Sequence, residues 1–274
     1  MDMDYSILLP VYSQDKPEYL TISIESMLNQ TVKSNDFVIV KDGPVTEELD
    51  AVINKYASNK ENNINVVALE VNSGLGAALD FGLRQCKNEL IARMDADDIS
   101  LPTRCEKLLE LFKNNPDLSI AGTNIDEFDE DPNIIISSRV VPTSDKEIKK
   151  YNRRRQAFNH PTIMFKKSEV LRVGSYPHIK HMEDKDLFFR MLNMDCIGAN
   201  IPESLLLFRS NKESFKRRRG KEYRKATIEV AKNAYKHKYI SYSDYLYMYW
   251  GQKFMKIIPN CLLIKLLRKK PKKK

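Results

Sequence analysis

The sequence has few cysteines and no long apolar run. These absences argue against a disulfide-rich, zinc-binding or membrane-spanning protein. Its four cysteines form no Cys-x-x-Cys pair, which argues against a zinc site or a disulfide framework and fits a reducing compartment. No stretch approaches the roughly 20 apolar residues that a helix needs to cross a bilayer. The chain begins with acidic residues where a secretory signal would be basic, and no long apolar segment follows them. We therefore expect a cytoplasmic protein.

Two common nucleotide-binding signatures are missing as well. No Gly-x-Gly-x-x-Gly follows the first apolar segment, and no Gly-x-x-x-x-Gly-Lys-Ser/Thr occurs anywhere, so neither the dinucleotide-binding fold nor the P-loop is predicted. The hydrophobic content of 42% and the charged content of 30% are those of a globular protein.

The net charge of +8 is unevenly distributed along the chain. Most acidic residues lie in residues 1–150, whereas basic clusters lie at 152–156 ("NRRRQ"), 216–221 ("KRRRGK") and 265–274 ("KLLRKKPKKK"). Such clusters suit the phosphates of nucleic acid, anionic lipid or a diphosphate substrate. A solvated face with a frayed tail explains them as well.

Apolar segments alternate with helical patterns through the first 113 residues. The predicted strands cover residues 5–10, 36–41, 64–69 and 89–94. The predicted helices cover residues 17–30, 46–56, 72–86 and 100–113. Short connections and nearly continuous apolar strands predict an α/β fold with a mostly parallel central sheet and helices on both faces.

The alternation weakens further along the chain. We expect short strands and a turn in residues 118–141, then a helix that begins with the capping box Ser144-x-x-Glu147. A strand over 160–167 and a helix over 183–192 follow, and from Tyr223 onward the chain reads as mainly helical.

Polar or turn-forming residues follow each of the first four predicted strands. Ligands of parallel sheets bind beyond the carboxyl ends of the strands, so we expect these segments to meet at one edge. Tyr12 can stack on a base, Asp42 can accept a hydrogen bond from a ring N–H or a sugar hydroxyl, and the glycines after Asn72 permit close approach of a ligand. Each also has a structural reading, as a loop aromatic, a turn former or the start of a helix.

The fourth of these segments carries three carboxylates within four positions, Asp95, Asp97 and Asp98. Anions this close disfavour one another's ionised forms unless a cation or a set of donors holds them. An Asp-x-Asp at a strand end suits Mg²⁺ or Mn²⁺, which take carboxylate oxygens and keep phosphate and water as further ligands. A solvated acidic turn is the alternative, and the position beside three other strand ends favours the metal.

A second acidic segment, "HMEDKD" at 181–186, lies about ninety residues further along the chain. A carboxylate here could accept a proton from a hydroxyl as a general base. Acids in the first turn of a helix are also ordinary capping residues.

Five segments, in this order and spacing, resemble the inverting family-2 glycosyltransferases of the GT-A fold: "ILLPVY", "VKDGP", "NSGLGAALDFGL", "ARMDADDIS" and "HMEDKDLFFRM". The resemblance covers roughly residues 5–210, and "FNHPTIMFKK" is similar to bacterial members that build surface polysaccharides such as capsule and lipopolysaccharide. It implies a Rossmann-like nucleotide-sugar fold, a nucleotide-diphosphate sugar donor, expected to be a UDP-sugar, and a divalent metal, Mn²⁺ or Mg²⁺.

The resemblance also implies roles for individual residues. Asp184 matches the general base, and Glu183 beside it shapes the acceptor site. Asp97, with Asp95, would bind the metal. The nucleotide sugar would contact Pro10, Tyr12, Asp42, Asn72, Gly74, Arg93 and Asp95.

The chain departs from the family pattern at two points. Lys41 and Pro44 stand in "VKDGP" where the family commonly has "VDDGS", which affects the contacts to the base. The arginine-tryptophan signature of processive members is absent, since Trp250 is the only tryptophan. We therefore expect transfer of a single sugar.

We expect a catalytic domain over residues 1–215, with a nucleotide-sugar half to about 122 and an acceptor half over 123–215. A helical, basic region over 216–274 would follow. Its residues 250–270 mix bulky apolar side chains with lysines, which suits a segment that lies on an anionic membrane surface. Packing against the domain is the alternative. A peripheral position at the inner face of the membrane would suit a glycan acceptor linked to lipid.

Two other functions use similar residues. A nucleotidyltransferase also holds a metal and a nucleotide, but it would carry a basic residue in an early glycine-rich loop, and "PVYSQDKPEY" offers little of that. A non-catalytic nucleic-acid-binding protein could use the arginine clusters, which lack interleaved aromatic residues. We therefore expect no nucleic-acid partner.

Overall fold

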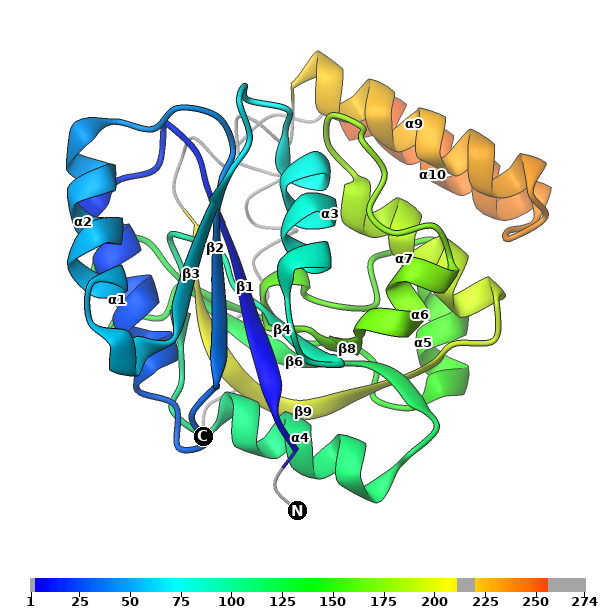
Figure 1. The fold of residues 1–274 in the computed structure, drawn as a ribbon. Coiled ribbons are helices and arrows are strands. Elements are labelled where there is room, and N and C mark those ends of the chain that lie inside the picture. The colour runs from blue at the N-terminus through cyan, green and yellow to red at the C-terminus, as the bar shows by residue number, and fades with distance from the viewer. Residues whose placement is uncertain (1–2, 211–219, 256–274) are drawn as a thin grey trace.

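A nine-stranded sheet runs through the centre of the protein (Figure 1). The computed structural model describes residues 3–210 and 220–255. The strands lie in the order β3-β2-β1-β4-β8-β6-β9-β5, with β7 paired to β6. Their bounds are β1 Tyr5–Val11, β2 Asp36–Lys41, β3 Ile64–Ala68, β4 Leu90–Arg93, β5 Ile99–Ser100, β6 Leu118–Phe128, β7 Ser137–Arg139, β8 Met164–Lys166 and β9 Ile197–Arg209.

Helices cover both faces of the sheet, as the sequence predicts. α1, α2 and α4 pack on one face, and α3, α5, α6 and α7 pack on the other. The helix bounds are α1 Pro17–Leu28, α2 Glu47–Ala57, α3 Leu75–Gln85, α4 Arg104–Asn114, α5 Asp145–Asn152, α6 Lys167–Arg172, α7 Glu183–Asn193, α9 Lys221–Lys236 and α10 Tyr242–Met255. Two 3₁₀ turns cover Lys60–Asn62 and His160–Thr162.

The first four strands in the order, β3-β2-β1-β4, are all parallel. Beyond β4 the sheet is mixed, because β8 is antiparallel to both of its neighbours whereas β9 is parallel to β6. The four predicted strands of residues 5–94 are therefore the parallel half, and the second half adds the antiparallel pairs.

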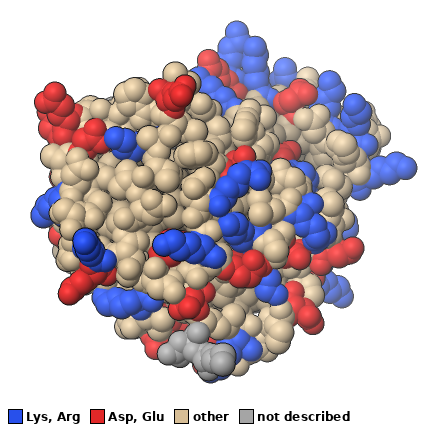
Figure 2. Space-filling view, viewed as in Figure 1, with Lys and Arg blue, Asp and Glu red and all other residues tan. Residues whose placement is uncertain are grey.

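The last two described helices form a pair beside α7. α9 and α10 bury Val230, Ala231 and Met248 together with Met182 and Phe189, which agrees with the helical prediction. Figure 2 shows Lys and Arg gathered along the upper right, over α9. Within residues 3–210 and 220–255, no helix is long and apolar enough to cross a membrane.

Several sequence predictions concern residues that the structure does not describe. The basic run at 265–274 lies outside the described residues, as does most of the 216–221 cluster. The predicted boundary near residue 215 also falls in the gap at 211–219.

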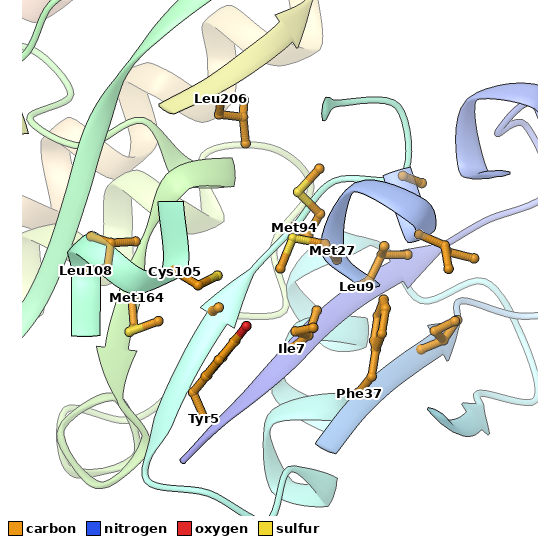
Figure 3. Packing of buried hydrophobic residues seen from close by; sticks show 14 of the residues in the cluster. Tyr5, Ile7, Leu9, Met27, Phe37, Met94, Cys105, Leu108, Met164 and Leu206 are labelled. Atoms are coloured by element: carbon orange, nitrogen blue, oxygen red, sulfur yellow. The ribbon is translucent and has the colours of Figure 1, made fainter. Parts of the chain in front are cut away.

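Alternation along β1 divides its side chains between two cores. Ile7 and Leu9 point to the side of α1, where they pack with Phe37 and Met27 (Figure 3). Leu8 points to the side of α3. There the helix approaches closely at Gly82, where a Cβ would lie 2.6 Å from Leu8 Cδ1. This fixes α3, and the turn before it, against the parallel strands.

Four local predictions were wrong or incomplete. Residues 118–128 form one long strand instead of short ones. The helix expected from Ser100 begins at Arg104, because residues 99–100 pair with β9. The strand expected over 160–167 covers only 164–166, since a 3₁₀ turn precedes it. The capping box does not form, because the Ser144 hydroxyl donates to the Glu147 carboxylate at 2.8 Å.

Candidate active site

The four predicted strand-end segments meet at one edge of the sheet. Their strands are neighbours and parallel, so their carboxyl ends lie side by side. The Asp42 N–H donates to the Val11 carbonyl at 2.8 Å, and the Met94 N–H donates to the Leu8 carbonyl at 3.0 Å. The residues just past each strand are therefore held together in space, as predicted.

Asp42 organises the turn that leads into α3. Its carboxylate oxygens accept the N–H groups of Ser73 and Gly74 at 2.7 and 3.0 Å. The Asn72 side-chain amide donates to the Asp42 carbonyl at 3.3 Å, and Gly74 has a φ of +89° at the start of the helix. A carboxylate offers about four acceptor positions, so Asp42 can hold this turn and still accept from a ligand.

The two remaining early residues differ in their access to a ligand. Pro10 is buried within β1, whereas Tyr12 is half-buried and its N–H donates to the Asp15 carboxylate at 2.9 Å. Lys41, which replaces a family acid, pairs with Asp50 at 2.8 Å. Its charge is thus paired within the protein.

Three carboxylates lie together just past β4. Asp95, Asp97 and Asp98 each offer an oxygen within 4.8 Å of the others. Arg93 holds Asp95 through two contacts, one of which joins Nη1 to Oδ2 at 2.6 Å. The Arg93 side chain is 1% exposed. It would therefore assist donor binding by positioning Asp95 and not by contacting the donor itself.

Asp98 is the buried member of this cluster. Its Oδ1 accepts the Arg209 N–H at 2.8 Å, while its Oδ2 is buried with no hydrogen-bond partner among the described residues. Burial, together with the charges of Asp97 and Asp95, raises the pKa of Asp98 well above its ordinary value. An unsatisfied buried carboxylate oxygen beside two other acids suits a hard divalent cation. The residues therefore fit a metal such as Mg²⁺ or Mn²⁺.

Two arginines that the sequence analysis gave no role support this loop. The Arg209 guanidinium donates to the Asp97 carbonyl at 3.0 Å and stacks on Tyr19 at 3.7 Å. Arg104 is fully buried and donates to the Arg93 carbonyl at 3.1 Å and to the Pro161 carbonyl at 2.8 Å. Both side chains fix the backbone that presents the carboxylates.

The second acidic pair lies in the first turn of α7. Glu183 is 8% exposed and Asp184 is 17% exposed. Asp184 Oδ1 accepts the Lys185 N–H at 2.7 Å, and Oδ2 accepts a hydrogen bond from the Gln156 side-chain amide. His160 Nδ1 lies 4.0 Å from the same oxygen. These contacts fix the orientation of the Asp184 carboxylate.

Burial sets the proton affinities around this pair. It raises the pKa of Asp184, although the Lys185 N–H and Gln156 oppose the change. It lowers the pKa of His160 well below the ordinary value, so this imidazole is neutral and forms no ion pair with Asp184. The other ring nitrogen of His160 lies 3.1 Å from the Tyr176 hydroxyl.

The two acidic segments come together because α3 packs on the start of α7. A Cβ on Gly76 would lie 2.1 Å from the Pro177 carbonyl oxygen and 3.3 Å from Glu183 Cβ. Two consecutive left-handed residues, His181 and Met182, turn the chain into α7. Asp95 and Arg93 lie near enough to Glu183 for their charges to affect its pKa. The predicted metal ligands and the predicted base thus share one site.

Gln156, His160, Tyr176 and Lys185 are the site residues that the sequence analysis missed. Gln156 ends the arginine-rich segment 152–156. That segment is the only feature of the sequence that draws attention to this loop. His160 is one of four histidines scattered along the sequence, and its position alone predicts no role. Nothing in the local sequence indicates that either side chain reaches Asp184.

The glycosyl transferase family 2 model matches residues 6–175. The chain belongs to this family. Among its relatives is UDP-Gal:α-D-GlcNAc-diphosphoundecaprenol β-1,3-galactosyltransferase of Escherichia coli, 37% identical over 256 residues, which are 93% of this chain and 92% of that protein. The amylovoran biosynthesis glycosyltransferase AmsE of Erwinia amylovora is 36% identical over 226 residues, 82% of this chain and 84% of that protein.

Solved structures share the GT-A fold of this glycosyltransferase. Staphylococcus aureus TarS, in complex with UDP-GlcNAc, has a TM-score of 0.67 and 15% identity, covering 97% of this chain and 76% of that one. Mannosyltransferase PcManGT of Pyrobaculum calidifontis, in complex with GDP-Man and Mn²⁺, has a TM-score of 0.66 and 13% identity, covering 86% and 65%. Family membership sets aside the nucleotidyltransferase and nucleic-acid-binding alternatives.

The contribution of Glu183 to the stability of the folded protein depends on pH. Burial and the Asp184 charge raise the pKa of Glu183 from 4.5 to about 7. The Glu183 carboxyl therefore ionises at a lower pH in the unfolded state than in the folded state. The stability that Glu183 contributes is complete below pH 4.5 and is lost as the pH rises to about 7, a change of about 3 kcal/mol.

We expect Glu183→Gln to remove this pH dependence, because the amide does not titrate. In metal-free buffer, the free energy of unfolding of the wild type relative to the variant should fall between pH 4.5 and 7 and level off above that. Chemical denaturation at half-unit pH steps measures the difference. A constant difference over this range would contradict the raised pKa.

Proposed function

We propose that this glycosyltransferase moves one sugar, with inversion, from a UDP-sugar to a hydroxyl of a lipid-linked glycan during surface-polysaccharide synthesis. The observation that supports this most is the cluster of Asp95–Asp98 carboxylates, with the charge of Asp95 acting on Glu183, the residue before Asp184. The name of the 37% identical E. coli relative supplies the UDP-sugar and the lipid-diphosphate acceptor as the substrate classes.

The donor would lie across the carboxyl ends of the parallel strands. Tyr12 and Asp42 would contact the base, with Pro10 forming the floor beneath them, and Asn72 and Gly74 would face the ribose and phosphates. Asp95 and Asp97 would hold Mn²⁺ or Mg²⁺, with Asp98 supplying the free oxygen beside them. When bound, the cation would neutralise charge that develops on the diphosphate leaving group.

Asp184 would act as the general base toward the acceptor. Its carboxylate takes the proton from the acceptor hydroxyl as that oxygen forms a bond to the anomeric carbon. The bond from this carbon to the diphosphate oxygen breaks on the opposite face, so the configuration inverts. Gln156 holds Asp184 in place, and the raised pKa of Asp184 makes its carboxylate a better proton acceptor. Glu183 would shape the acceptor site.

We expect Asp184→Asn to keep donor binding and to lose about 10²- to 10⁴-fold in turnover, the contribution typical of a general base. The amide can still be positioned by its neighbours, but it cannot accept the proton. Donor affinity by calorimetry and the rate of sugar transfer separate the two effects.

Asp186→Asn is the matched control. Asp186 lies in the same turn of α7 and pairs with Arg190 at 2.8 Å, so the control changes a neighbouring acid without touching Asp184. Its transfer rate should stay within a few-fold of the wild type, as expected for loss of a partly exposed ion pair. Wild-type turnover in Asp184→Asn would rule out Asp184 as the base.

We also propose that the α9–α10 pair brings the enzyme to the inner face of an anionic membrane. Residues 220–255 carry seven basic and three acidic side chains, and Figure 2 shows Lys and Arg side chains gathered over α9. On α10, Trp250 and Phe254 are 53% and 59% exposed and their rings lie 6.2 Å apart. Exposed aromatic side chains beside basic residues suit the headgroup region of a bilayer.

The double substitution Trp250→Ser and Phe254→Ser should weaken binding to vesicles that contain phosphatidylglycerol, because it removes the apolar anchor. Ile134→Ser is the control, since Ile134 is 63% exposed but lies outside α9 and α10. Sedimentation with vesicles at low and high salt measures the effect. Equal sedimentation of both variants and the wild type would exclude α10 as a membrane contact.

A further inference from the structure

A cavity of about 200 Å³ lies beside the proposed base, between the loop after α5, the start of α7 and the α9–α10 pair. We propose that it binds the diphosphate of a lipid-linked acceptor, an inference that rests on the proposed function. Polar and basic groups line it: Arg154, Arg155, Gln156, Lys185, Tyr223 and Gln252.

The cavity wall carries positive charge that the protein only partly neutralises. Arg154 Nε pairs with Asp244 at 2.6 Å, and its guanidinium lies 5.0 Å from the Tyr247 ring. Arg155 donates to the Tyr247 hydroxyl at 3.5 Å and has no carboxylate partner within residues 3–210 and 220–255. Arg155 is exposed to the cavity mouth. A guanidinium in this position suits an oxyanion with several acceptor oxygens.

Lys185 fixes the loop that carries these arginines. Its side-chain nitrogen is buried and donates to the carbonyls of Asn152 and Arg155, the latter at 2.6 Å. It also lies 4.3 Å from the Phe189 ring. Because Lys185 follows Asp184 directly, it joins the arginine loop to the turn that carries the proposed base. We assign it a positioning role.

Gln156 connects the cavity to the reacting atoms. It lines the cavity, and its amide donates to Asp184 Oδ2. A hydroxyl at Asp184 and a diphosphate in the cavity would thus lie on either side of the Gln156 side chain. In the acceptor named for the E. coli relative, the diphosphate is attached to a single GlcNAc. This sugar would connect the two positions.

The cavity offers room for a group of the size of a diphosphate, about 200 Å³. Tyr247, Met248 and Gly251 of α10 face the cavity, and Trp250 and Phe254 extend along the adjoining exposed side. The lipid chain would leave along α10 toward the membrane.

Calorimetry with farnesyl diphosphate tests the cavity without knowledge of the acceptor sugar. The titration is made in the presence of saturating UDP and Mn²⁺, which occupy the donor site. We expect the wild type to bind and Arg155→Gln to bind about 10- to 100-fold more weakly, as for the loss of one charge-assisted hydrogen bond. Arg155→Lys, which keeps the charge, should recover part of the affinity.

Arg84→Gln is the matched control, because Arg84 is an exposed arginine paired with Asp80 on α3. It should bind farnesyl diphosphate like the wild type, and all variants should bind UDP with Mn²⁺ equally. The proposal is overturned if the wild type does not bind, if Arg155→Gln binds as tightly, or if UDP with Mn²⁺ displaces the probe. If the cavity binds the probe but no nucleotide sugar is transferred, the proposed function fails and the cavity assignment stands.

Discussion

Electrostatic repulsion among Asp95, Asp97 and Asp98 is the constraint on which the site depends. The protein places three carboxylate oxygens within 4.8 Å and offsets the charge with the Arg93 guanidinium on Asp95 and a backbone N–H on Asp98. These donors leave one buried oxygen of Asp98 without a partner in the described chain. Two further arginines fix the loop without neutralising it. The arrangement is therefore completed best by a cation, which would also attract a diphosphate.

The acceptor side of the site depends on a different contact. α3 begins at the edge of the sheet, where Asp42 holds the turn before it. Gly76 lets the Pro177 carbonyl, in the loop before α7, approach so closely that no larger residue would fit. Glu183 is thereby brought near enough to the carboxylate cluster for the charge of Asp95 to act on it, although about ninety residues separate them in the sequence. Lys185 then ties the arginine loop to the same turn. The start of α7 thus connects the edge of the sheet where the donor would bind, the proposed base and the basic cavity.

The parallel half of the fold could be predicted because its signals are local. Apolar runs and turn residues define β1 to β4, and parallel pairing alone places Tyr12, Asp42, Asn72 and Asp95 at one edge. The rest depends on contacts between distant residues. β6 becomes one long strand only because β9 pairs along it, and Arg209 reaches the Asp97 carbonyl across 112 positions. The contact of Gln156 with Asp184 likewise follows from tertiary packing, so no sequence pattern indicated it.

In the proposed reaction, the Asp95–Asp98 carboxylates would bind a nucleotide diphosphate through a divalent cation. Calorimetric titration of UDP, with and without Mn²⁺, into the wild type and Asp97→Asn tests it most directly. We expect the wild type to bind UDP only when Mn²⁺ is present. The variant should lose most of this affinity, and its remaining binding should not depend on Mn²⁺. Binding of UDP by the wild type with equal affinity in the absence of Mn²⁺, or unchanged Mn²⁺-dependent binding in Asp97→Asn, would contradict it.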